Sequence, residues 1–322
     1  MSGDDWRPAT DIASLRQRAA LLQHARAYFR ERGVLEVETP VAQTHTVTDV
    51  QIASLRLATD PPRYLQTSPE YPMKRLLAAG SGDIYQICKV FRAGERSRLH
   101  SPEFTMIEWY RLDFDLAAIM AETAALVARL LSCAGKIAPP VELLTYSEAF
   151  SRELGCDPLA ASADDLNGLC AGLGLAAQSI ASASRDDLLD FLIATAVGPR
   201  LGRDRLTCLH HFPATQAALA QIDPQDSRTA LRFELYAQGT ELANGYVELG
   251  NATDQQQRFA ADLAERMRRG LPALAMDSRL LAALQHGLPR CAGVALGFDR
   301  VAMLALGAAS IDQVQAFSWE NA

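Results

Sequence analysis

The stretch "FRAGERSRLHSPEFTMIEWYR", residues 91–111, combines four arginines, one histidine and three glutamates with four aromatic rings. A solvated surface favours the charges without the rings, and a core favours the rings without the charges. An anionic, ring-bearing ligand explains the mixture, because guanidinium groups pair with phosphates and aromatic rings stack on bases. The stretch therefore indicates a candidate nucleotide site.

This candidate nucleotide site lies on a predicted hairpin. "DIYQICKVFR" and "EFTMIEWYRL" are strand-like, and a charged loop, residues 94–102, lies between them. Arg92 lies where the first strand meets the loop, and its fork of donors suits a phosphate, while Phe104 is placed to stack on a base. The loop adds three side chains that could reach outer phosphates: Arg96, Arg98 and His100. Taken alone, the stretch fits equally well a charged hairpin tip held by surface ion pairs, with Phe104 in the core.

The bulk composition narrows the class of protein. The chain has 322 residues, is 49% hydrophobic and carries a net charge of −7, which argues against a broad nucleic-acid surface because phosphate binding needs a basic footprint. The six cysteines show no Cys-x-x-Cys pair and no zinc-ligand spacing, which indicates reduced thiols. The N-terminus lacks an apolar run, and no stretch is expected to reach the length of a membrane span. We therefore expect a cytoplasmic protein without a membrane segment.

Hydrophobic periodicity predicts an α+β fold. A helix near the N-terminus is predicted from positions that share one face: Leu15, Ala19, Leu22, Arg26 and Phe29. A short strand is predicted over residues 34–40, a helix over 116–133, and a helical insertion over 145–205, where short helical pieces are joined by Pro, Gly and Ser. Strands from distant parts of the chain, mostly in hairpins, predict an antiparallel sheet flanked by helices in a single domain, residues 1–322.

A second candidate site is the stretch "FELYAQGTELANGYVE", residues 233–248. A two-residue hairpin turn at Gln238-Gly239 makes Glu234 and Glu241 diagonal neighbours on one strand face. Two close carboxylates repel each other unless a cation lies between them, and a magnesium ion that also binds substrate phosphates would satisfy them. A bulge at Asn244-Gly245 would be needed to bring Glu248 to the same face. The alternative is an ordinary polar outer face of a hairpin.

A third candidate site is "GVALGFDRVAML", residues 293–304, which is predicted as a strand that runs into a helix. Its glycines would let a ligand approach the backbone closely, and Arg300 could lie over a ring or reach a phosphate. The stretch is neither G-x-G-x-x-G nor a Walker A sequence. Taken alone, such a strand-to-helix junction is commonly structural.

Taken together, in this order and spacing, the segments resemble the catalytic core of class II aminoacyl-tRNA synthetases. "YFRERGVLEVETP" is similar to motif 1, "VFRAGE" with "HSPEFTMIEWY" to motif 2, and "GVALGFDR" to motif 3. "TSPEYPMKRLL", "FTMIEWY" and "ELANGYVEL" resemble the lysyl-tRNA synthetase pattern. Motif 1 begins too early, by about residue 15, for an N-terminal anticodon-binding domain. Stand-alone cores of this kind form the elongation factor P lysine (β-lysine) ligase family, which "HHFPATQAALAQI" and "EWYR" also resemble.

The resemblance implies an ATP-dependent, AMP-forming ligase. Such an enzyme activates (R)-β-lysine, or lysine, to an aminoacyl-adenylate and transfers the acyl group to a lysine side chain of elongation factor P. A homodimer is expected, because motif 1 forms the dimer interface in class II enzymes, and tRNA is not expected as the acceptor. Two alternatives are a truncated lysyl-tRNA synthetase that charges tRNA and a non-catalytic paralogue that senses amino acids.

The resemblance also implies roles for individual residues at the nucleotide site. Arg92 and Arg300 are the expected catalytic residues, with Arg92 on the α-phosphate and Arg300 sandwiching adenine against Phe104. Glu234 and Glu241 are the expected ligands of Mg²⁺. The remaining residues expected to bind or border ATP are Gly94, Glu95, His100, Ser101, Leu242 and Gly297. Gly94 stands where synthetases usually have a glutamate that reads the adenine amine, so Glu95 or the backbone would supply that contact.

The amino-acid pocket is expected to be rich in carboxylates, because the substrate carries two ammonium groups that must leave water. The residues expected to line it are Ser68, Pro69, Glu70, Glu108, Tyr110, Asn244, Glu248 and Ala295. Ala295 stands where lysyl-tRNA synthetases typically have glycine. Our hypothesis is that its methyl group shrinks the pocket and sets the preference for β-lysine over lysine.

Overall fold

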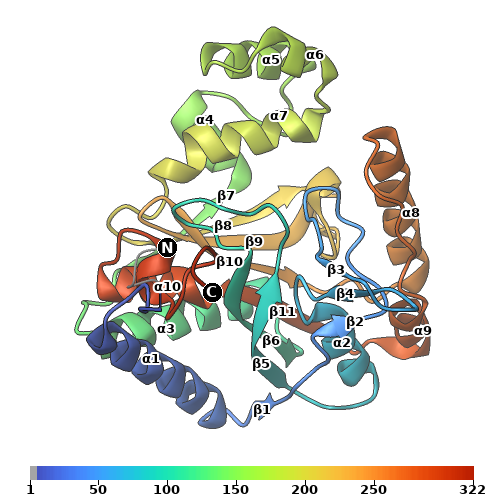
Figure 1. Cartoon of the computed structure of the whole chain (residues 1–322). Helices are drawn as coiled ribbons and strands as arrows, with labels where there is room; N and C mark the ends of the chain where they lie inside the picture. The colour runs from blue at the N-terminus through green and yellow to red at the C-terminus, as the bar shows by residue number, and fades with distance from the viewer. Residues whose placement is uncertain (1–5) are drawn as a thin grey trace. The chain divides into compact units, whose positions relative to one another are not determined.

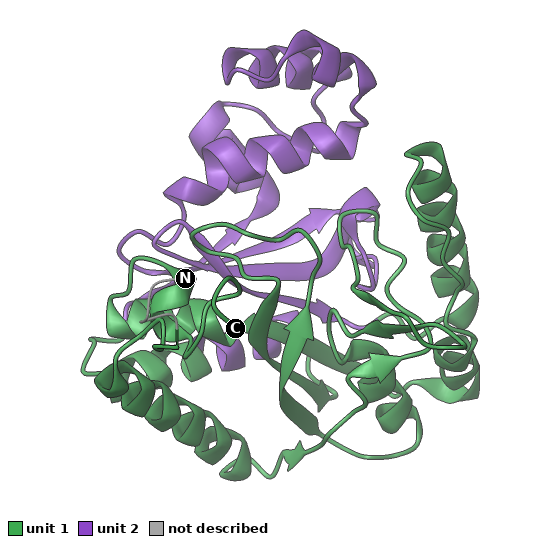
Figure 2. Ribbon diagram, in the orientation of Figure 1, with its two compact units in different colours: residues 1–115, 125–138, 249–322 green, residues 116–124, 139–248 purple. Residues whose placement is uncertain are grey.

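The computed structural model describes residues 6–322, which fall into two compact units (Figures 1 and 2). The first unit comprises residues up to 115 together with 125–138 and 249–322, and the second comprises 116–124 and 139–248. Helix α3, Leu116–Cys133, contributes to both. The predicted α+β class is confirmed, because each unit combines a mainly antiparallel sheet with helices.

The first unit carries four neighbouring sheet strands in the order β1-β5-β6-β11 and a small three-stranded sheet in the order β2-β4-β3 (Figure 1). Its strands are β1 (Leu35–Glu36), β2 (Ala42–Gln43), β3 (Arg56–Leu57), β4 (Arg63–Leu65), β5 (Ile84–Phe91), β6 (Glu103–Leu112) and β11 (Cys291–Gly297). Its helices are α1 (Ile12–Arg30), α2 (Glu70–Ala78), α8 (Ala252–Arg268), α9 (Ser278–Gly287) and α10 (Phe298–Leu306). The motif 1 strand is shorter than the predicted 34–40, since only Leu35 and Glu36 pair, in parallel, with β5.

Helix α1 begins at a side-chain cap and packs through its second half. Asp11 accepts a hydrogen bond from the backbone N–H of Ser14, which satisfies one of the free donors of the first turn. The predicted helix is confirmed, but its buried face differs from the predicted one and consists of Leu21, Ala25, Tyr28 and Phe29, whereas Ala19 and Arg26 are exposed. The Phe29 ring stacks on Tyr85 of β5, with centroids 4.3 Å apart, and this aromatic contact fixes the helix on the sheet.

The predicted hairpin of the nucleotide segment is confirmed as β5 and β6, which pair antiparallel along their length. On its other side β6 pairs antiparallel with β11. Across these three strands Gln86 lies opposite Glu108, and Glu108 lies opposite Ala295. Side chains directly opposite each other in a sheet share a face, so these three residues form one row.

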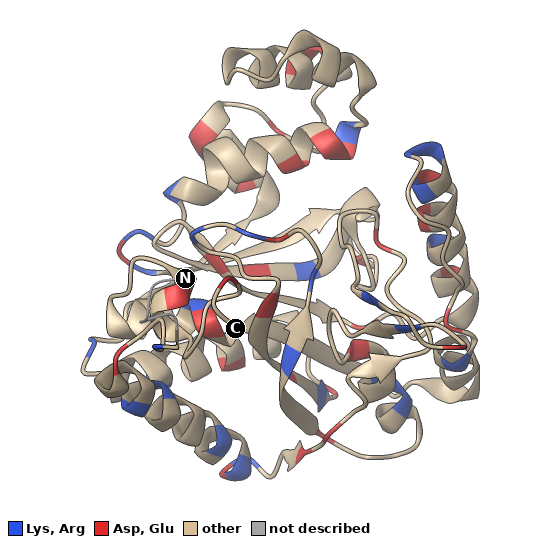
Figure 3. Ribbon diagram, viewed as in Figure 1, with Lys and Arg blue, Asp and Glu red and all other residues tan. Residues whose placement is uncertain are grey.

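The second unit carries a sheet in the order β10-β9-β8-β7 and the short helices of the predicted insertion. Its strands are β7 (Val141–Thr145), β8 (Leu206–Pro213), β9 (Thr229–Ala237) and β10 (Thr240–Val247), and its helices include α4 (Tyr146–Leu154), α5 (Ala163–Gly172), α6 (Ala177–Ser182) and α7 (Arg185–Leu192). Three of these helices begin with a capping box, formed by Thr145 with Glu148, Ser162 with Asp165, and Ser184 with Asp187. The negative charges of these acids also stabilise the helices, because they lie near the positive end of each helix dipole. The charged first turn of α7 is visible in Figure 3.

The β9–β10 hairpin has the predicted turn but a different bulge. Gln238 and Gly239 both have positive φ, 50° and 71°, as a two-residue type I′ turn requires, and Tyr236 lies opposite Glu241. The bulge that would be needed to bring Glu248 to the face of Glu234 and Glu241 is not at Asn244-Gly245, because the register shifts between Glu241 and Ala243. The extra residue is Leu242, whose side chain is buried. The register shift lies three residues after the turn and places Asn244 opposite Glu234.

The expectation that no stretch reaches the length of a membrane span is wrong for α3. Its 18 residues have a mean hydropathy of 1.6, which is enough by length and composition alone. However, 56% of that stretch is buried inside the protein, and the core helices of globular proteins pass the same test. The helix boundaries agree with the predicted 116–133.

Two glycines of the second unit have the same backbone conformation but different surroundings, so replacing each with alanine distinguishes the cost of backbone strain from that of a steric clash. Gly202 and Gly155 both have φ of +65°, but a Cβ at Gly202 would lie 2.6 Å from the Ala237 Cα and from the Tyr236 carbonyl oxygen, whereas a Cβ at Gly155 would meet nothing within 4 Å. We expect Gly155→Ala to lower the free energy of unfolding by about 1–2 kcal/mol, and Gly202→Ala by on the order of 4 kcal/mol. Denaturant unfolding measures both, and equal losses would contradict the predicted clash.

Candidate nucleotide and amino-acid site

Arg92 and Phe104 lie together at the loop end of the β5–β6 hairpin. The backbone N–H of Arg92 donates to the Pro102 carbonyl at 2.9 Å, which closes the base of the loop. The Arg92 guanidinium lies over the Phe104 ring, 5.2 Å from its centroid. Its Nη1 is 3.8 Å from Glu95. A planar cation beside a flat ring is an arrangement that can hold a phosphate and a base at once.

Arg300 lies on the first turn of α10, directly after β11, and contacts the same loop. Its Nη2 donates to His100 Nε2 at 2.7 Å, and its Nε lies 3.4 Å from the Leu99 carbonyl oxygen. Because arginine can only donate, His100 Nε2 is the acceptor, and the other nitrogen, Nδ1, carries the proton that it shares with Ser97 Oγ at 2.7 Å. His100 is therefore held as a neutral ring that orients Arg300.

The remaining arginines of the loop contact the C-terminal segment. Arg96 forms ion pairs with Asp312 and Glu320, at 2.9 and 2.5 Å. Arg98 donates to the Ala309 carbonyl at 2.9 Å. That both arginines could reach outer phosphates stays a prediction. The C-terminal segment holds the loop that carries the other candidate residues, of which Gly94 has φ of +78° and Ser101 is buried.

Glu108 is the centre of the candidate amino-acid site. Its side chain is 2% exposed, and both carboxylate oxygens accept hydrogen bonds at 2.7 Å, one from the Tyr110 hydroxyl and one from the Ser68 hydroxyl. Ser68 Oγ also accepts from the backbone N–H of Glu70 at 3.0 Å. The structure thus brings three predicted residues, Ser68, Glu108 and Tyr110, into direct contact. Hydroxyl donors stabilise the ionised carboxylate and leave its charge available to an ammonium group.

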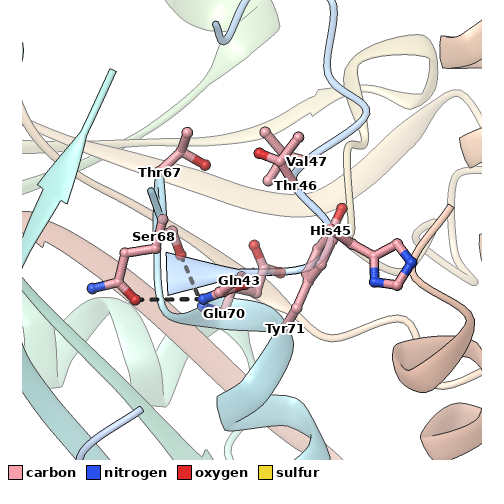
Figure 4. Close-up of a pocket in the computed structure, with 9 residues that line it drawn as sticks. Gln43, His45, Thr46, Val47, Thr67, Ser68, Glu70 and Tyr71 are labelled. Carbon is pink, nitrogen blue, oxygen red and sulfur yellow. Dashed lines mark hydrogen bonds between the residues drawn. The ribbon is translucent and has the colours of Figure 1, made fainter. Parts of the chain in front are cut away.

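Glu70 opens α2 and lies on a hollow in the first unit. Pro69 is the residue before the helix, and Glu70 accepts from Lys74 Nζ at 2.7 Å, with the lysine 1% exposed. Figure 4 shows Glu70 and Ser68 among the residues that line this pocket, together with Gln43, His45, Thr46, Val47, Thr67 and Tyr71. The sequence analysis missed Lys74, although its spacing of four residues from Glu70 is the signal of a helical ion pair.

Two of the predicted site residues, Ala295 and Gly297, lie on β11, which pairs with β6. Ala295 lies opposite Glu108, and Gly297 lies opposite Met106 at the start of α10. Both are partly exposed between buried neighbours. The Ala295 methyl group therefore lies on the same sheet face as the Glu108 side chain.

In the second unit, Glu234 and Glu241 form the predicted pair of acids, with an arginine that the prediction lacked. Arg232 Nη2 donates to Glu234 at 2.6 Å, and the Tyr236 hydroxyl donates to its other oxygen at 2.7 Å. Burial, helped by the charge of Glu241 and opposed by Arg232 and Tyr236, raises the pKa of Glu234 to about 7. The period-two spacing of Arg232, Glu234 and Tyr236 along β9 was the signal for this cluster.

Three further predicted residues lie on or next to β10. Asn244 Oδ1 accepts from Arg232 Nε at 3.2 Å, so it joins the Glu234 cluster. Leu242 is buried at the bulge, and Glu248 is buried beyond the strand end, where its backbone carbonyl accepts from Gln221 at 2.9 Å. Within residues 6–322, no group of three or more histidines, cysteines or acids is arranged to hold a metal ion. Any ion at Glu234 and Glu241 would therefore take most of its ligands from elsewhere, as Mg²⁺ does from phosphates and water.

The chain is similar over its whole length to one group of proteins. Residues 5–321 match the family described as tRNA synthetases class II (D, K and N). A protein of Klebsiella pneumoniae (strain 342), named elongation factor P–(R)-beta-lysine ligase, is 48% identical over 324 aligned residues that cover 98% of each chain. Proteins of the same name from Avibacterium paragallinarum and Vibrio cholerae serotype O1 are each 47% identical and are covered completely, as is this chain.

Release of Arg96 is expected to loosen the loop. In the double variant Asp312→Asn, Glu320→Gln the guanidinium loses both carboxylates, so the Ser97 and His100 amides, which donate to each other's carbonyls at 3.1 and 3.2 Å, should exchange hydrogen about twofold to fivefold faster. Hydrogen exchange read by mass spectrometry measures this. Asp226→Asn, which removes another exposed ion pair, the one with Arg228, is the control. Unchanged exchange at the loop would show that the ion pairs do not hold it.

Proposed function

The chain belongs to the class II tRNA synthetase family of the D, K and N type, and we propose that it activates (R)-β-lysine with ATP and transfers it to a lysine side chain of elongation factor P. The observation that carries the proposal is the buried Glu108 carboxylate, held by Ser68 and Tyr110 on the strand that follows the Arg92 loop. It offers a charged acceptor for a substrate ammonium, in a chain that also carries the Arg92 cation for phosphate and is similar from end to end to the named elongation factor P ligases.

The first step is proposed to be adenylation. The substrate carboxylate oxygen attacks the α-phosphorus of ATP in line, the bond to the β-phosphate oxygen breaks, and pyrophosphate leaves. Arg92 lies at the end of β5 with its guanidinium over Phe104, and there it would neutralise the charge that grows on the α-phosphate oxygens. We assign Arg300, oriented by His100, and the Phe104 ring to the adenine, with Gly297 leaving room beside them. Glu95, Ser101 and the Gly94 backbone complete the proposed ATP contacts.

The amino acid is proposed to bind through its two ammonium groups. Glu108 and Glu70 supply negative charge, and the Ser68 and Tyr110 hydroxyls keep Glu108 in one orientation. Ala295 limits the space beside Glu108 and would favour the β-amino acid. Pro69, Asn244 and Glu248 complete the proposed substrate set.

The second step is proposed to be aminolysis of the adenylate. The neutral ε-amine of an elongation factor P lysine attacks the acyl carbon, the bond to the phosphate oxygen breaks, AMP leaves, and the new amide nitrogen loses one proton. The acceptor amine must be neutral when it attacks, so this step should be favoured at higher pH. We also propose that residues 1–322 act as one catalytic domain, that the enzyme is a cytoplasmic homodimer, and that it does not use tRNA.

Mg²⁺ fits the chemistry of the acid pair in the second unit. Glu234 and Glu241 are close enough for each charge to act on the other, and carboxylate oxygens are the donors that Mg²⁺ prefers. Glu234 and Glu241 would hold the ion, which would supply positive charge to the pyrophosphate leaving group. Arg232 already balances part of this charge, so the ion would compete with an internal cation.

Elongation factor P should gain the mass of one lysyl residue when it is incubated with this protein, ATP and (R)-β-lysine. Arg92→Ala should slow the reaction by about 10²–10³-fold, because it removes a charge that acts on the transition state. Arg228→Ala, at an exposed ion pair of the second unit, should leave the rate unchanged. Mass spectrometry of elongation factor P reads the outcome. Pyrophosphate exchange without mass gain would redirect the acceptor to tRNA, and absence of exchange would favour a sensor.

Mg²⁺ affinity should rise with pH across neutrality. The ion binds the ionised carboxylate, and because the pKa of Glu234 is raised to about 7, a proton competes below that pH and is released on binding near it. In Glu241→Gln the repulsion is lost, so the pKa of Glu234 should fall and the pH dependence should shift down. Calorimetric titration with Mg²⁺ and ATP, in buffers of different ionisation enthalpy, counts the released protons. Binding that does not change with pH would contradict a role for Glu234.

A further inference from the structure

We infer that Gln86 is a further substrate-binding residue, whose side-chain carbonyl accepts a hydrogen bond from the terminal ammonium of the diamino acid. This inference rests on the proposed function and extends it to a residue outside the three sequence motifs. Gln86 lies in the middle of β5, with Glu108 as its direct neighbour on β6.

The side-chain carbonyl of Gln86 is a buried acceptor in need of a donor. The residue is 3% exposed, and no protein group in the described residues 6–322 donates to its Oε1. A buried amide oxygen without a donor costs on the order of 1–3 kcal/mol, so such groups are few in folded proteins. A substrate group that donates there would recover this energy on binding.

The position of this acceptor points to the amino-acid site. Gln86, Glu108 and Ala295 form one row across β5, β6 and β11, so the Gln86 side chain stands on the same sheet face as the carboxylate assigned to the substrate. Opposite residues in antiparallel strands have Cβ atoms about 5 Å apart. One ammonium group, which has three hydrogens to donate, can therefore meet both an oxygen of Glu108 and the Gln86 carbonyl.

The carbonyl oxygen is the part of the Gln86 side chain that a ligand could meet. Gln86 Oε1 has no donor among the described residues 6–322. Cys88 lies two residues along the same strand face, and burial raises the pKa of its thiol to about 12, so this neighbour stays a neutral thiol and does not compete for a substrate ammonium as an acid would.

The distance along β5 selects the terminal ammonium rather than the amine next to the carboxylate. Gln86 and Arg92 are six residues apart, which in a strand is about 20 Å. Arg92 is assigned to the α-phosphate, to which the substrate carboxylate becomes joined. The amine near the carboxylate must stay close to that end, and only the extended side chain reaches back toward Gln86.

A neutral acceptor suits this place better than another acid would. Glu108 already supplies a full negative charge opposite Gln86, and a second buried carboxylate there would repel it, as Glu241 and Glu234 do in the second unit. Glutamine adds a hydrogen-bond acceptor without that penalty. It would therefore sharpen the selection for a terminal amine without adding charge.

Comparing two substrates, with and without the terminal amine, distinguishes a substrate-binding role of Gln86 from a purely structural one. The variant Gln86→Met keeps the length of the side chain and removes its polar atoms, and Gln255→Met is the matched control, because Gln255 is 1% exposed on α8 and its Oε1 likewise has no donor within the described residues. Pyrophosphate exchange is measured for (R)-β-lysine and for the β-amino acid of the same length without the terminal amine. Thermal unfolding is measured for each protein.

In Gln86→Met, kcat/KM for (R)-β-lysine should fall about 10- to 100-fold, mainly through KM, while kcat/KM for the analogue stays unchanged. Gln255→Met should keep the wild-type preference. If Gln86→Met lowers both substrates equally, or keeps the full preference because water or protein meets the carbonyl, the inference is overturned. If the wild type exchanges with neither substrate, the proposed function fails instead.

Discussion

The register of β6 between β5 and β11 is the constraint on which the candidate amino-acid site of the first unit depends. It places Gln86, Glu108 and Ala295 in one row, and it is fixed from the opposite face of the sheet. There Trp109 is fully buried and Phe29 of α1 packs against it and against Tyr85, with ring centroids 5.5 and 4.3 Å apart. A slip of one residue would turn Trp109 into the polar pocket and Glu108 into this aromatic core, so apolar packing holds the polar row in place.

Three acids of the candidate sites, Glu108, Glu70 and Glu234, each have a partner that fits their task. Glu108 has hydroxyl donors, which orient its carboxylate and leave its negative charge for a substrate cation. Glu70 has Lys74, which offsets much of its charge, and Glu234 has both Arg232 and Tyr236. Because a buried charge without compensation is costly, these partners allow the pockets to form before any ligand binds.

Local signals predicted much of the fold. The Gln-Gly turn fixed the start of the β9–β10 register, and hydrophobic periodicity predicted the bounds of α3. The bulge at Leu242 could not be placed, because its position depends on which side chains the neighbouring strands bury. The pairing of Arg96 with Glu320 joins residues 224 apart in the chain, and composition gives no signal for such a contact. Gln86 was overlooked because an unpaired acceptor is visible only once its surroundings are known.

The two kinds of candidate residue are held with different stiffness, and this difference suits a two-substrate reaction. The residues assigned to the amino acid lie in mid-strand or at the start of α2, under buried packing and short hydrogen bonds, where precise geometry is kept. Those assigned to the nucleotide lie at strand ends and on the 94–102 loop, which is held by exposed ion pairs that contribute little rigidity. Discrimination between amino acids needs fixed acceptors, whereas ATP must enter and pyrophosphate and AMP must leave. A rigid sheet with a loosely tethered loop meets both requirements in one chain.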